Sequence, residues 1–284
     1  MMKISRIGVV GAGTMGHGIA QVAAVAGYEV HLVDSFEDAL ERGMERIGSS
    51  LEKLVAKERI SADDRDGALG RLRPSGDIGV LSDVDLAIEA VVEKLEIKQE
   101  VLRDLDTVCA PETILASNTS SISITRLAAS TDRPEKVIGM HFMNPVPLMK
   151  LVEIIRGLAT DEETYGLIET ATRRMGKTPV EVFDSPGFVS NRVLLPMINE
   201  AVFCLHEGVA AAESIDEVMR LGMNHPMGPL ALADLIGLDV CLDILDVLYT
   251  ELRDPKYGAC PLLVKMVNAG RLGRKSGRGF YDYG

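Results

Sequence analysis

The sequence lacks the features that would mark a membrane-spanning, exported or metal-binding protein. No stretch approaches the roughly 18 uninterrupted apolar residues that a membrane helix needs. The segment Met1–Arg6 has no apolar core of a signal peptide. The cysteines form no CxxC pair and have no histidine cluster beside them; they are Cys109, Cys204, Cys241 and Cys260. We therefore expect reduced core cysteines, no metal site, and a soluble, cytoplasmic protein.

The sequence also lacks an excess of positive charge. Its 30 Lys and Arg residues stand against 42 Asp and Glu residues, which gives a net charge of −12. Nucleic acids and anionic membranes are held by positive fields. Neither is therefore expected as a partner, and any anionic ligand must be held by a local group of cations.

Short β-rich runs alternate with helix-length segments from Lys3 to about Val182. The expected strands are Ile4–Val10, Glu29–Val33, Asp85–Glu89, Ile114–Ser117, Val137–Met140, Leu151–Ile155 and Thr178–Val182. Between the second and third strands, apolar residues at helical spacing from Phe36 to Leu54 predict a long helix, and Ser61 is the expected cap of another. This alternation is typical of an open parallel sheet assembled from βαβ units.

The alternation stops after residues 184–187 (Asp-Ser-Pro-Gly), and helical periodicity follows. One helix is marked by apolar residues from Leu194 to Leu205, and another by those of Leu235–Leu252. A chain of 284 residues is long enough for two domains. The predicted fold class is α/β, with a Rossmann-type, mostly parallel sheet domain over residues 1–186 and a smaller all-α domain over residues 187–284.

A glycine-rich turn directly follows the first expected strand. It reads Gly11-Ala12-Gly13-Thr14-Met15-Gly16, a GxGxxG pattern with a helical run behind it. Such glycines permit a tight turn, approach of a pyrophosphate and close helix packing, with the helix N-terminus facing the phosphates. Asp34 ends the second strand without an adjacent arginine, so it can accept from ribose hydroxyls and would repel a 2′-phosphate. The pattern predicts NAD as cofactor; a glycine turn without a nucleotide is the alternative.

His141 differs from the other histidines in its position. It follows the expected strand Val137–Met140, and two prolines shortly after it prevent a helix. We therefore expect it at the carboxyl edge of the sheet, where open α/β folds bind ligands. Glu153 lies inside the next apolar run, where an unpaired carboxylate is costly. We expect Glu153 to pair with one ring nitrogen of His141 while the other exchanges a proton. A structural histidine and a solvent-facing glutamate are the alternatives.

Five longer motifs occur in order along essentially the whole chain. They are Asn118–Ser121 (NTSS), His141–Pro145 (HFMNP), Ser185–Arg192 (SPGFVSNR), Asn224–Pro229 (NHPMGP) and Gly273–Tyr281 (GRKSGRGFY). Together they resemble the L-3-hydroxyacyl-CoA dehydrogenase family, particularly bacterial members that act on 3-hydroxybutyryl-CoA. The chain departs from the family at Met143, where many members carry Phe, which bears on the shape of the pocket wall.

The resemblance implies an NAD-dependent oxidoreductase that interconverts (S)-3-hydroxyacyl-CoA and 3-ketoacyl-CoA, on a short chain such as 3-hydroxybutyryl-CoA and acetoacetyl-CoA. It makes His141 the catalytic acid or base and Glu153 its partner. Ser120 and Asn191 would bind around the C3 oxygen and the thioester. From the residues alone, helix capping and inter-domain bonding are the alternatives for these two. Further residues implied to contact the cofactor are Glu93, Lys98, Asn144 and Lys275, each of which is a common surface residue when taken alone.

For coenzyme A, the resemblance points to the long helix after the second strand, at Ser50 and Lys57 with Lys53 nearby. Lys53, Lys57 and Arg59 form the local cationic patch that an acidic protein needs for a polyanion. A solvated helix face is the alternative. The resemblance also implies a homodimer assembled through the carboxy-terminal helices.

Two other functions stay open from the sequence. A β-hydroxyacid dehydrogenase of related architecture that acts on a free sugar acid would not need Lys53 and Lys57. A nucleotide-sensing or structural protein would keep the fold without turnover. The presence of four residues argues against this second alternative: Ser120, His141, Glu153 and Asn191.

Overall fold

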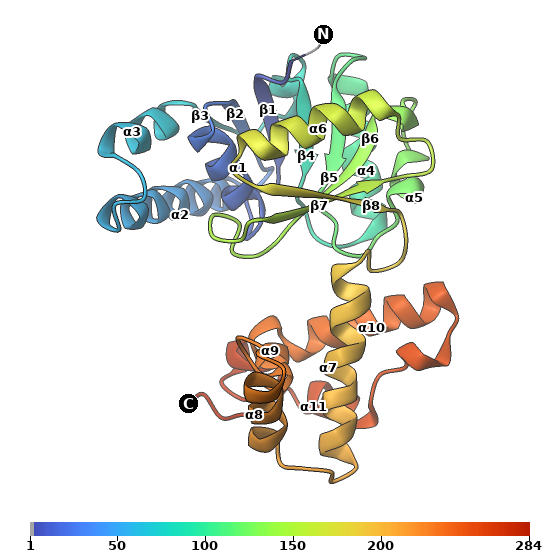
Figure 1. The fold of residues 1–284 in the computed structure, drawn as a ribbon. Helices are drawn as coiled ribbons and strands as arrows, with labels where there is room; N and C mark the ends of the chain where they lie inside the picture. The colour runs from blue at the N-terminus through green and yellow to red at the C-terminus, as the bar shows by residue number, and fades with distance from the viewer. Residues whose placement is uncertain (1–2) are drawn as a thin grey trace. The chain divides into compact units, whose positions relative to one another are not determined.

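The computed structural model describes residues 3–284 and contains two compact units. The first unit ends at Asp184 and holds the sheet, and the second runs from Ser185 to Gly284 and is helical (Figure 1). The predicted Rossmann-type α/β fold followed by an all-α part is confirmed. Within residues 3–284, no helix combines the length and apolar character that crossing a bilayer requires.

The strands described in the first unit form one eight-stranded sheet. They are β1 (Arg6–Val10), β2 (Glu29–Val33), β3 (Leu72–Ser75), β4 (Leu86–Glu89), β5 (Ile114–Ser117), β6 (Val137–Phe142), β7 (Leu151–Arg156) and β8 (Thr178–Phe183). Their order is β3-β2-β1-β4-β5-β6-β7-β8, and every neighbouring pair is parallel except β6 and β7. The order changes direction between β1 and β4, and open sheets bind ligands at the carboxyl ends of strands around such a switch point.

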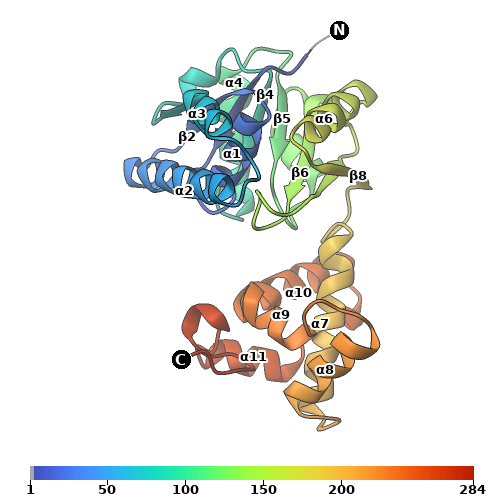
Figure 2. The ribbon, with the colours of Figure 1, turned by 60° about the vertical axis from the view of Figure 1, so that its left-hand side comes forward.

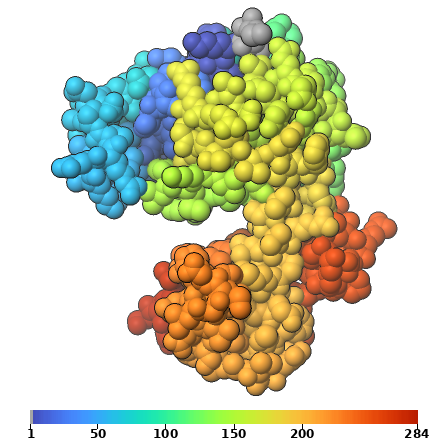
Figure 3. Space-filling model, viewed as in Figure 1, coloured from blue at the N-terminus to red at the C-terminus, as the bar shows by residue number. Residues whose placement is uncertain are grey.

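Helices cover both faces of this sheet (Figures 1 and 2). They are α1 (Gly16–Val25), α2 (Glu37–Ala56), α3 (Ala62–Gly70), α4 (Leu95–Val108), α5 (Ile124–Ala128) and α6 (Glu162–Arg174). Helices α1, α2, α3 and α6 share one hydrophobic core with the strands, to which Ile19, Ile47, Ala68 and Ile168 contribute. Helices α4 and α5 contact β4, β5 and β6 outside that core. The α2–α3 pair forms a lobe that projects from this unit (Figure 3).

Among the differences between the expected and the observed elements of the first unit, two affect the edge of the sheet and the candidate site. Strand β3 was not predicted, because it is a four-residue edge strand that contains Pro74, and proline is confined to such positions in sheets. Strand β6 continues past Met140, so His141 lies inside the strand and not after it. The expected helix pair after β2 is confirmed, including the cap at Ser61, whose Oγ accepts from the backbone N–H of Asp64 at 3.0 Å.

The described helices of the second unit surround a core of their own. They are α7 (Ser190–His206), α8 (Ala212–Gly222), α9 (Pro229–Ile236), α10 (Leu238–Leu252) and α11 (Pro261–Asn268). Leu195, Leu230 and Leu245 are fully buried in this core. The prediction of a single helix over Leu235–Leu252 is wrong, because this segment is divided between the end of α9 and the whole of α10. Gly237 separates α9 from α10 with a φ of +109°, a conformation that glycine adopts readily.

Candidate active site

The glycine turn between β1 and α1 has the close contacts that a dinucleotide loop requires. A Cβ on Gly16 would lie 1.6 Å from the carbonyl oxygen of Gly11, and Gly11 itself has a φ of +101°. A Cβ on Gly13 would meet no atom within 4 Å, so the turn leaves open space at this glycine. Gly13 and Thr14 are exposed. The backbone of the turn can therefore be approached closely by a phosphate group.

The start of α1 fits an anionic ligand. Its N-cap residue, Met15, makes no side-chain capping bond, and the first turn carries no acidic residue. The first N–H groups of a helix lack intrahelical partners, and the helix dipole favours an anion there. Asp34 closes the other side of the turn: one carboxylate oxygen accepts from Ala12 N at 2.8 Å and the other from Phe36 N at 3.0 Å. These residues fit the pyrophosphate and ribose of NAD.

His141 and Glu153 form a buried pair at the carboxyl end of β6. The two residues lie directly opposite each other in the antiparallel pairing of β6 and β7, which puts both side chains on one face. His141 Nδ1 is 2.8 Å from Glu153 Oε2, and the two residues are 8% and 2% exposed. A carboxylate can only accept, so Nδ1 carries the proton and Nε2 faces away from Glu153. The expected contact between these residues is present.

Ser120 lies in the loop after β5, and polar side chains hold this loop in place. Glu93 Oε1 accepts from Ser120 N at 2.9 Å and lies 3.2 Å from Ser120 Oγ. Asn118 Oδ1 accepts from Phe142 N at 3.0 Å and so ties this loop to the end of β6. The structure therefore joins three expected site residues, Ser120, Glu93 and Lys98, because Lys98 Nζ is 3.2 Å from Glu93 Oε2.

Lys98 is not the exposed residue that its sequence context suggested. Lys98 is 1% exposed, and its ammonium forms an ion pair with Glu89 at 2.8 Å. Glu89 is itself fully buried at the end of β4. Burial, the largest single effect, would raise the pKa of Glu93. The ammonium of Lys98 and the hydrogen bonds from Thr119 and Ser120 outweigh burial and hold that pKa below its usual value. Glu93 is therefore an anion at neutral pH.

Asn144 lies on the exposed loop between β6 and β7, before a cis peptide bond to Pro145. Lys177 anchors this loop from beneath: its ammonium donates to the carbonyl oxygens of Val146 and Met149, the latter at 2.8 Å. Burial lowers the pKa of Lys177. These bonds fix the carboxyl side of the loop that carries Asn144.

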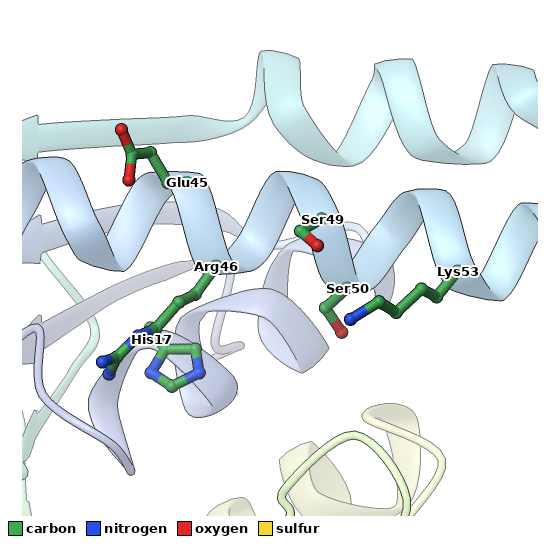
Figure 4. A pocket seen from close by; sticks show the side chains of 6 residues that line it. All are labelled: His17, Glu45, Arg46, Ser49, Ser50 and Lys53. Carbon is green, nitrogen blue, oxygen red and sulfur yellow. The ribbon is translucent and has the colours of Figure 1, made fainter.

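A cavity of about 460 Å³ lies along α2 (Figure 4). It is lined by His17, Glu45, Arg46, Ser49, Ser50 and Lys53. Arg46, Ser50 and Lys53 extend from one side of the helix toward His17, while the carboxylate of Glu45 points to the other side (Figure 4). The cavity thus combines two cations with hydroxyl groups. It contains Ser50 and Lys53 of the expected coenzyme A patch, whereas Lys57 lies at the C-cap of α2.

Two of the expected residues belong to the second unit. Asn191 is the second residue of α7, and its backbone N–H donates to Gly187 O at 3.1 Å. Lys275 lies in the short turn after α11 and forms an ion pair with Asp239 at 2.6 Å. The loop and tail around these residues are therefore ordered within their own unit.

Comparison with known proteins decides the family. Residues 6–185 match the NAD-binding domain of 3-hydroxyacyl-CoA dehydrogenase, and residues 187–283 match its C-terminal domain. The chain belongs to the 3-hydroxyacyl-CoA dehydrogenase family. It is therefore an oxidoreductase with an NAD-binding domain, and both the resemblance and the expected cofactor are confirmed.

Similar proteins cover the whole chain. A probable 3-hydroxybutyryl-CoA dehydrogenase of Bacillus subtilis is 57% identical over 99% of this chain and 98% of its own length. A 3-hydroxybutyryl-CoA dehydrogenase of Bradyrhizobium diazoefficiens is 54% identical over 99% and 96%. The crystal structure of (S)-3-hydroxybutyryl-CoA dehydrogenase from Ralstonia eutropha is 51% identical, with a TM-score of 0.97, and the match covers 99% of this chain and 100% of that one.

Sequence reasoning missed three residues of this family member's candidate site. His17 was not among the expected site residues, yet it lines the α2 cavity, and its Nδ1 lies 2.6 Å from Gly13 O in the glycine turn. Arg46 lies four residues before Ser50, a spacing that puts both on one side of a helix. Glu89 ends an apolar strand, where the cost of burying a carboxylate could have indicated a partner.

Proposed function

We propose that this protein interconverts (S)-3-hydroxyacyl-CoA and 3-ketoacyl-CoA with NAD⁺ or NADH, and that its substrate is short, as in 3-hydroxybutyryl-CoA and acetoacetyl-CoA. The observation that carries the proposal is the buried contact between His141 Nδ1 and Glu153 at 2.8 Å, at the sheet edge of an NAD-binding domain. The names of the full-length relatives support the short acyl chain.

The chain's own residues act on the proton and the position of the substrate. Glu153 holds Nδ1–H of His141, which directs Nε2 toward the 3-hydroxyl and stabilises the imidazolium that forms when Nε2 takes its proton. Ser120 and Asn191 hold the C3 oxygen and the thioester, a positioning effect. When bound, the nicotinamide supplies the hydride acceptor or donor. Gly11 to Gly16 and Asp34 hold the cofactor, and Glu93, Lys98, Asn144 and Lys275 complete its site.

The α2 cavity is proposed as the place where the coenzyme A phosphates bind. Arg46 and Lys53 supply the local positive charge that a polyanion requires on a protein of net charge −12, and Ser50 supplies a hydroxyl donor. Lys57 follows on the same helix and extends this charge. The subunits are proposed to pair as a homodimer through the helices of the second unit.

The proposal is tested by measuring NADH oxidation with 3-ketoacyl-CoA substrates of increasing chain length. We expect the highest kcat/KM with acetoacetyl-CoA. Turnover of free 3-keto acids at an equal kcat/KM would contradict a coenzyme A substrate and favour a related β-hydroxyacid dehydrogenase. NADH binding without turnover of any 3-keto compound would contradict an enzymatic role.

The role of the cavity is tested with Arg46→Gln and Lys53→Gln, and with Arg42→Gln as the matched control. Arg42 lies on the same helix, is exposed, and interacts with Asp38 at 3.7 Å outside the cavity. We expect KM for acetoacetyl-CoA to rise several-fold in the first two variants, with a weaker dependence on salt, and kcat to change less, because these contacts are equal in ground and transition states. An equal loss on a short thioester without the nucleotide would mean that the cavity is structural.

A further inference from the structure

Glu89 is a fully buried carboxylate at the carboxyl end of β4. Its Oε1 accepts from Val91 N at 2.7 Å and from Lys98 Nζ at 2.8 Å, and its Oε2 accepts from Ser117 Oγ at 2.7 Å. The peptide carbonyl of Glu89 also accepts from Asn118 N at 2.8 Å. This one residue therefore binds the segment before α4 and the loop after β5 at the same time.

The ammonium of Lys98 makes all its contacts with acceptors around Glu89. Its ammonium has three N–H donors, and three acceptors surround it: Glu89 Oε1 at 2.8 Å, Glu93 Oε2 at 3.2 Å and Val91 O at 3.3 Å. All three donors are used, and the side chain is 1% exposed. Lys98 therefore acts on a bound cofactor through Glu93, because a direct hydrogen bond would require it to release one of these partners.

Glu93 connects Lys98 to the loop after β5. Its Oε1 accepts from Thr119 Oγ1 at 2.6 Å, from Ser120 N at 2.9 Å and from Ser121 N at 3.1 Å. On the other side, Ser117 Oγ accepts from Thr119 N at 3.2 Å while it donates to Glu89. The loop that carries Ser120 is thus held between two carboxylates that share one ammonium.

We propose that Glu89 is the positioning residue of this site, because its buried carboxylate fixes Lys98 and Ser117 and thereby sets Glu93 and Ser120. Because Glu89 is fully buried, it acts through these partners. The effect on the substrate rests on the proposed function, through the role of Ser120. The effect on cofactor binding rests on the role of Glu93 toward NAD and is measured separately.

The charge of Glu89 matters more than its hydrogen bonds in this arrangement. A glutamine at position 89 keeps the shape: its amide oxygen can accept from Val91 N and Lys98, and Ser117 Oγ can turn to accept from its NH₂ group. What it removes is one of the two anions that attract Lys98. The ammonium is then drawn toward Glu93 alone, and Glu93 changes its position relative to Ser120.

The experiment compares Glu89→Gln with Glu96→Gln, which removes an exposed carboxylate from the first turn of α4 and serves as the matched control. We measure Tm, the Kd for NADH by fluorescence titration, and kcat and KM with acetoacetyl-CoA. For Glu89→Gln we expect the Kd for NADH to rise and kcat to fall, each on the order of tenfold, since small misplacements of positioning groups have effects of this size or larger. The control should stay within about twofold of the wild type.

A second pair of variants separates positioning from stability. Lys98→Met leaves two carboxylates without their ammonium and should lower Tm strongly, whereas Glu89→Gln with Lys98→Met removes both partners and should recover much of that Tm. We expect NADH binding and kcat to stay low in the double variant, because Glu93 still lacks its ammonium.

Either of two results would overturn the role of Glu89: wild-type Kd and kcat in Glu89→Gln, or recovery of NADH binding and turnover together with Tm in the double variant. A wild-type protein that binds NADH but does not reduce acetoacetyl-CoA would contradict the proposed function instead. The NADH Kd of the variants would still decide the role of Glu89 in that case.

Discussion

Alanine at Gly13 and at Gly16 provides a test of the cofactor loop at two positions that differ in the space around the added methyl group. At Gly16 the new Cβ would lie 1.6 Å from Gly11 O, whereas at Gly13 it would meet no atom within 4 Å. Neither glycine has a φ in the left-handed region, so backbone strain does not distinguish them. The two variants therefore separate a packing effect from an effect on the ligand.

The expected effect at Gly16 follows from the distance. Cβ contacts essentially never fall below 3.0 Å, so α1 and the turn must separate by at least 3.0 − 1.6 = 1.4 Å. Overpacking of this kind costs about 1–3 kcal/mol, and each kcal/mol lowers Tm by roughly 2–4 °C in a unit of this size. We expect Tm to fall by roughly 2–12 °C. The Kd for NADH should rise on the order of 100-fold, because the loss of about two charge-assisted hydrogen bonds has that effect.

Gly13→Ala should leave Tm within about 1 °C of the wild type, because a surface substitution without a clash changes stability little. Its Kd for NADH should still rise roughly tenfold or more, since the methyl group occupies space that the pyrophosphate requires. Thermal denaturation and fluorescence titration of NADH measure both quantities. Normal NADH binding by Gly13→Ala would refute the approach of a pyrophosphate to this turn, and an unchanged Tm in Gly16→Ala would refute the tight contact.

Three further predictions concern single side chains. His141→Gln should fold and bind NADH but lose on the order of 10²–10⁴ in kcat, and Glu153→Gln should also lower kcat, because an amide cannot stabilise an imidazolium as a carboxylate does; near-normal turnover would remove the pair from the mechanism. NADH should be preferred to NADPH, and Asp34→Asn should narrow the difference in kcat/KM; equal values in the wild type would contradict the role of Asp34. The folded-state pKa of Glu93 lies below its ordinary 4.5, so its contribution to stability is present above that pH and is lost as the pH falls through the lower, folded-state value. Glu93→Gln should therefore flatten the dependence of the unfolding free energy on pH in this acidic range. Denaturant titrations at a series of pH values measure this dependence, and the same dependence in the variant and the wild type would contradict the ion pair.

The sequence could predict those parts of the site that obey a local rule. The glycine spacing placed the cofactor turn, and a carboxylate inside an apolar strand required a partner, which is how Glu153 was assigned to His141. The same rule applies to Glu89, but this residue ends its strand, where the sequence alone does not distinguish burial from exposure. Its burial depends on Lys98 and Ser117, which come from separate segments of the chain.

Other features depend on tertiary contacts that no local pattern contains. Lys98 lies on a helix with polar neighbours and has the sequence context of a surface lysine, whereas the end of β4 buries it. The α2 cavity joins Arg46 and Lys53 to His17, which lies on a different helix. Strand β3 lacks a β-type pattern and exists because β2 offers it an edge.

The antiparallel pairing of β6 and β7 determines which changes in chain length the His141–Glu153 pair can tolerate. The pair is aligned by the backbone ladder that joins the strands, whereas the connection between them, residues 143–150, lies outside the ladder. Residues inserted into that connection would leave the alignment intact, so its length can vary without loss of the pair. A single residue deleted from β7 between Glu153 and Arg156 would shift Glu153 by one place relative to the rest of the strand and turn its carboxylate to the opposite face of the sheet, because side chains alternate along a strand.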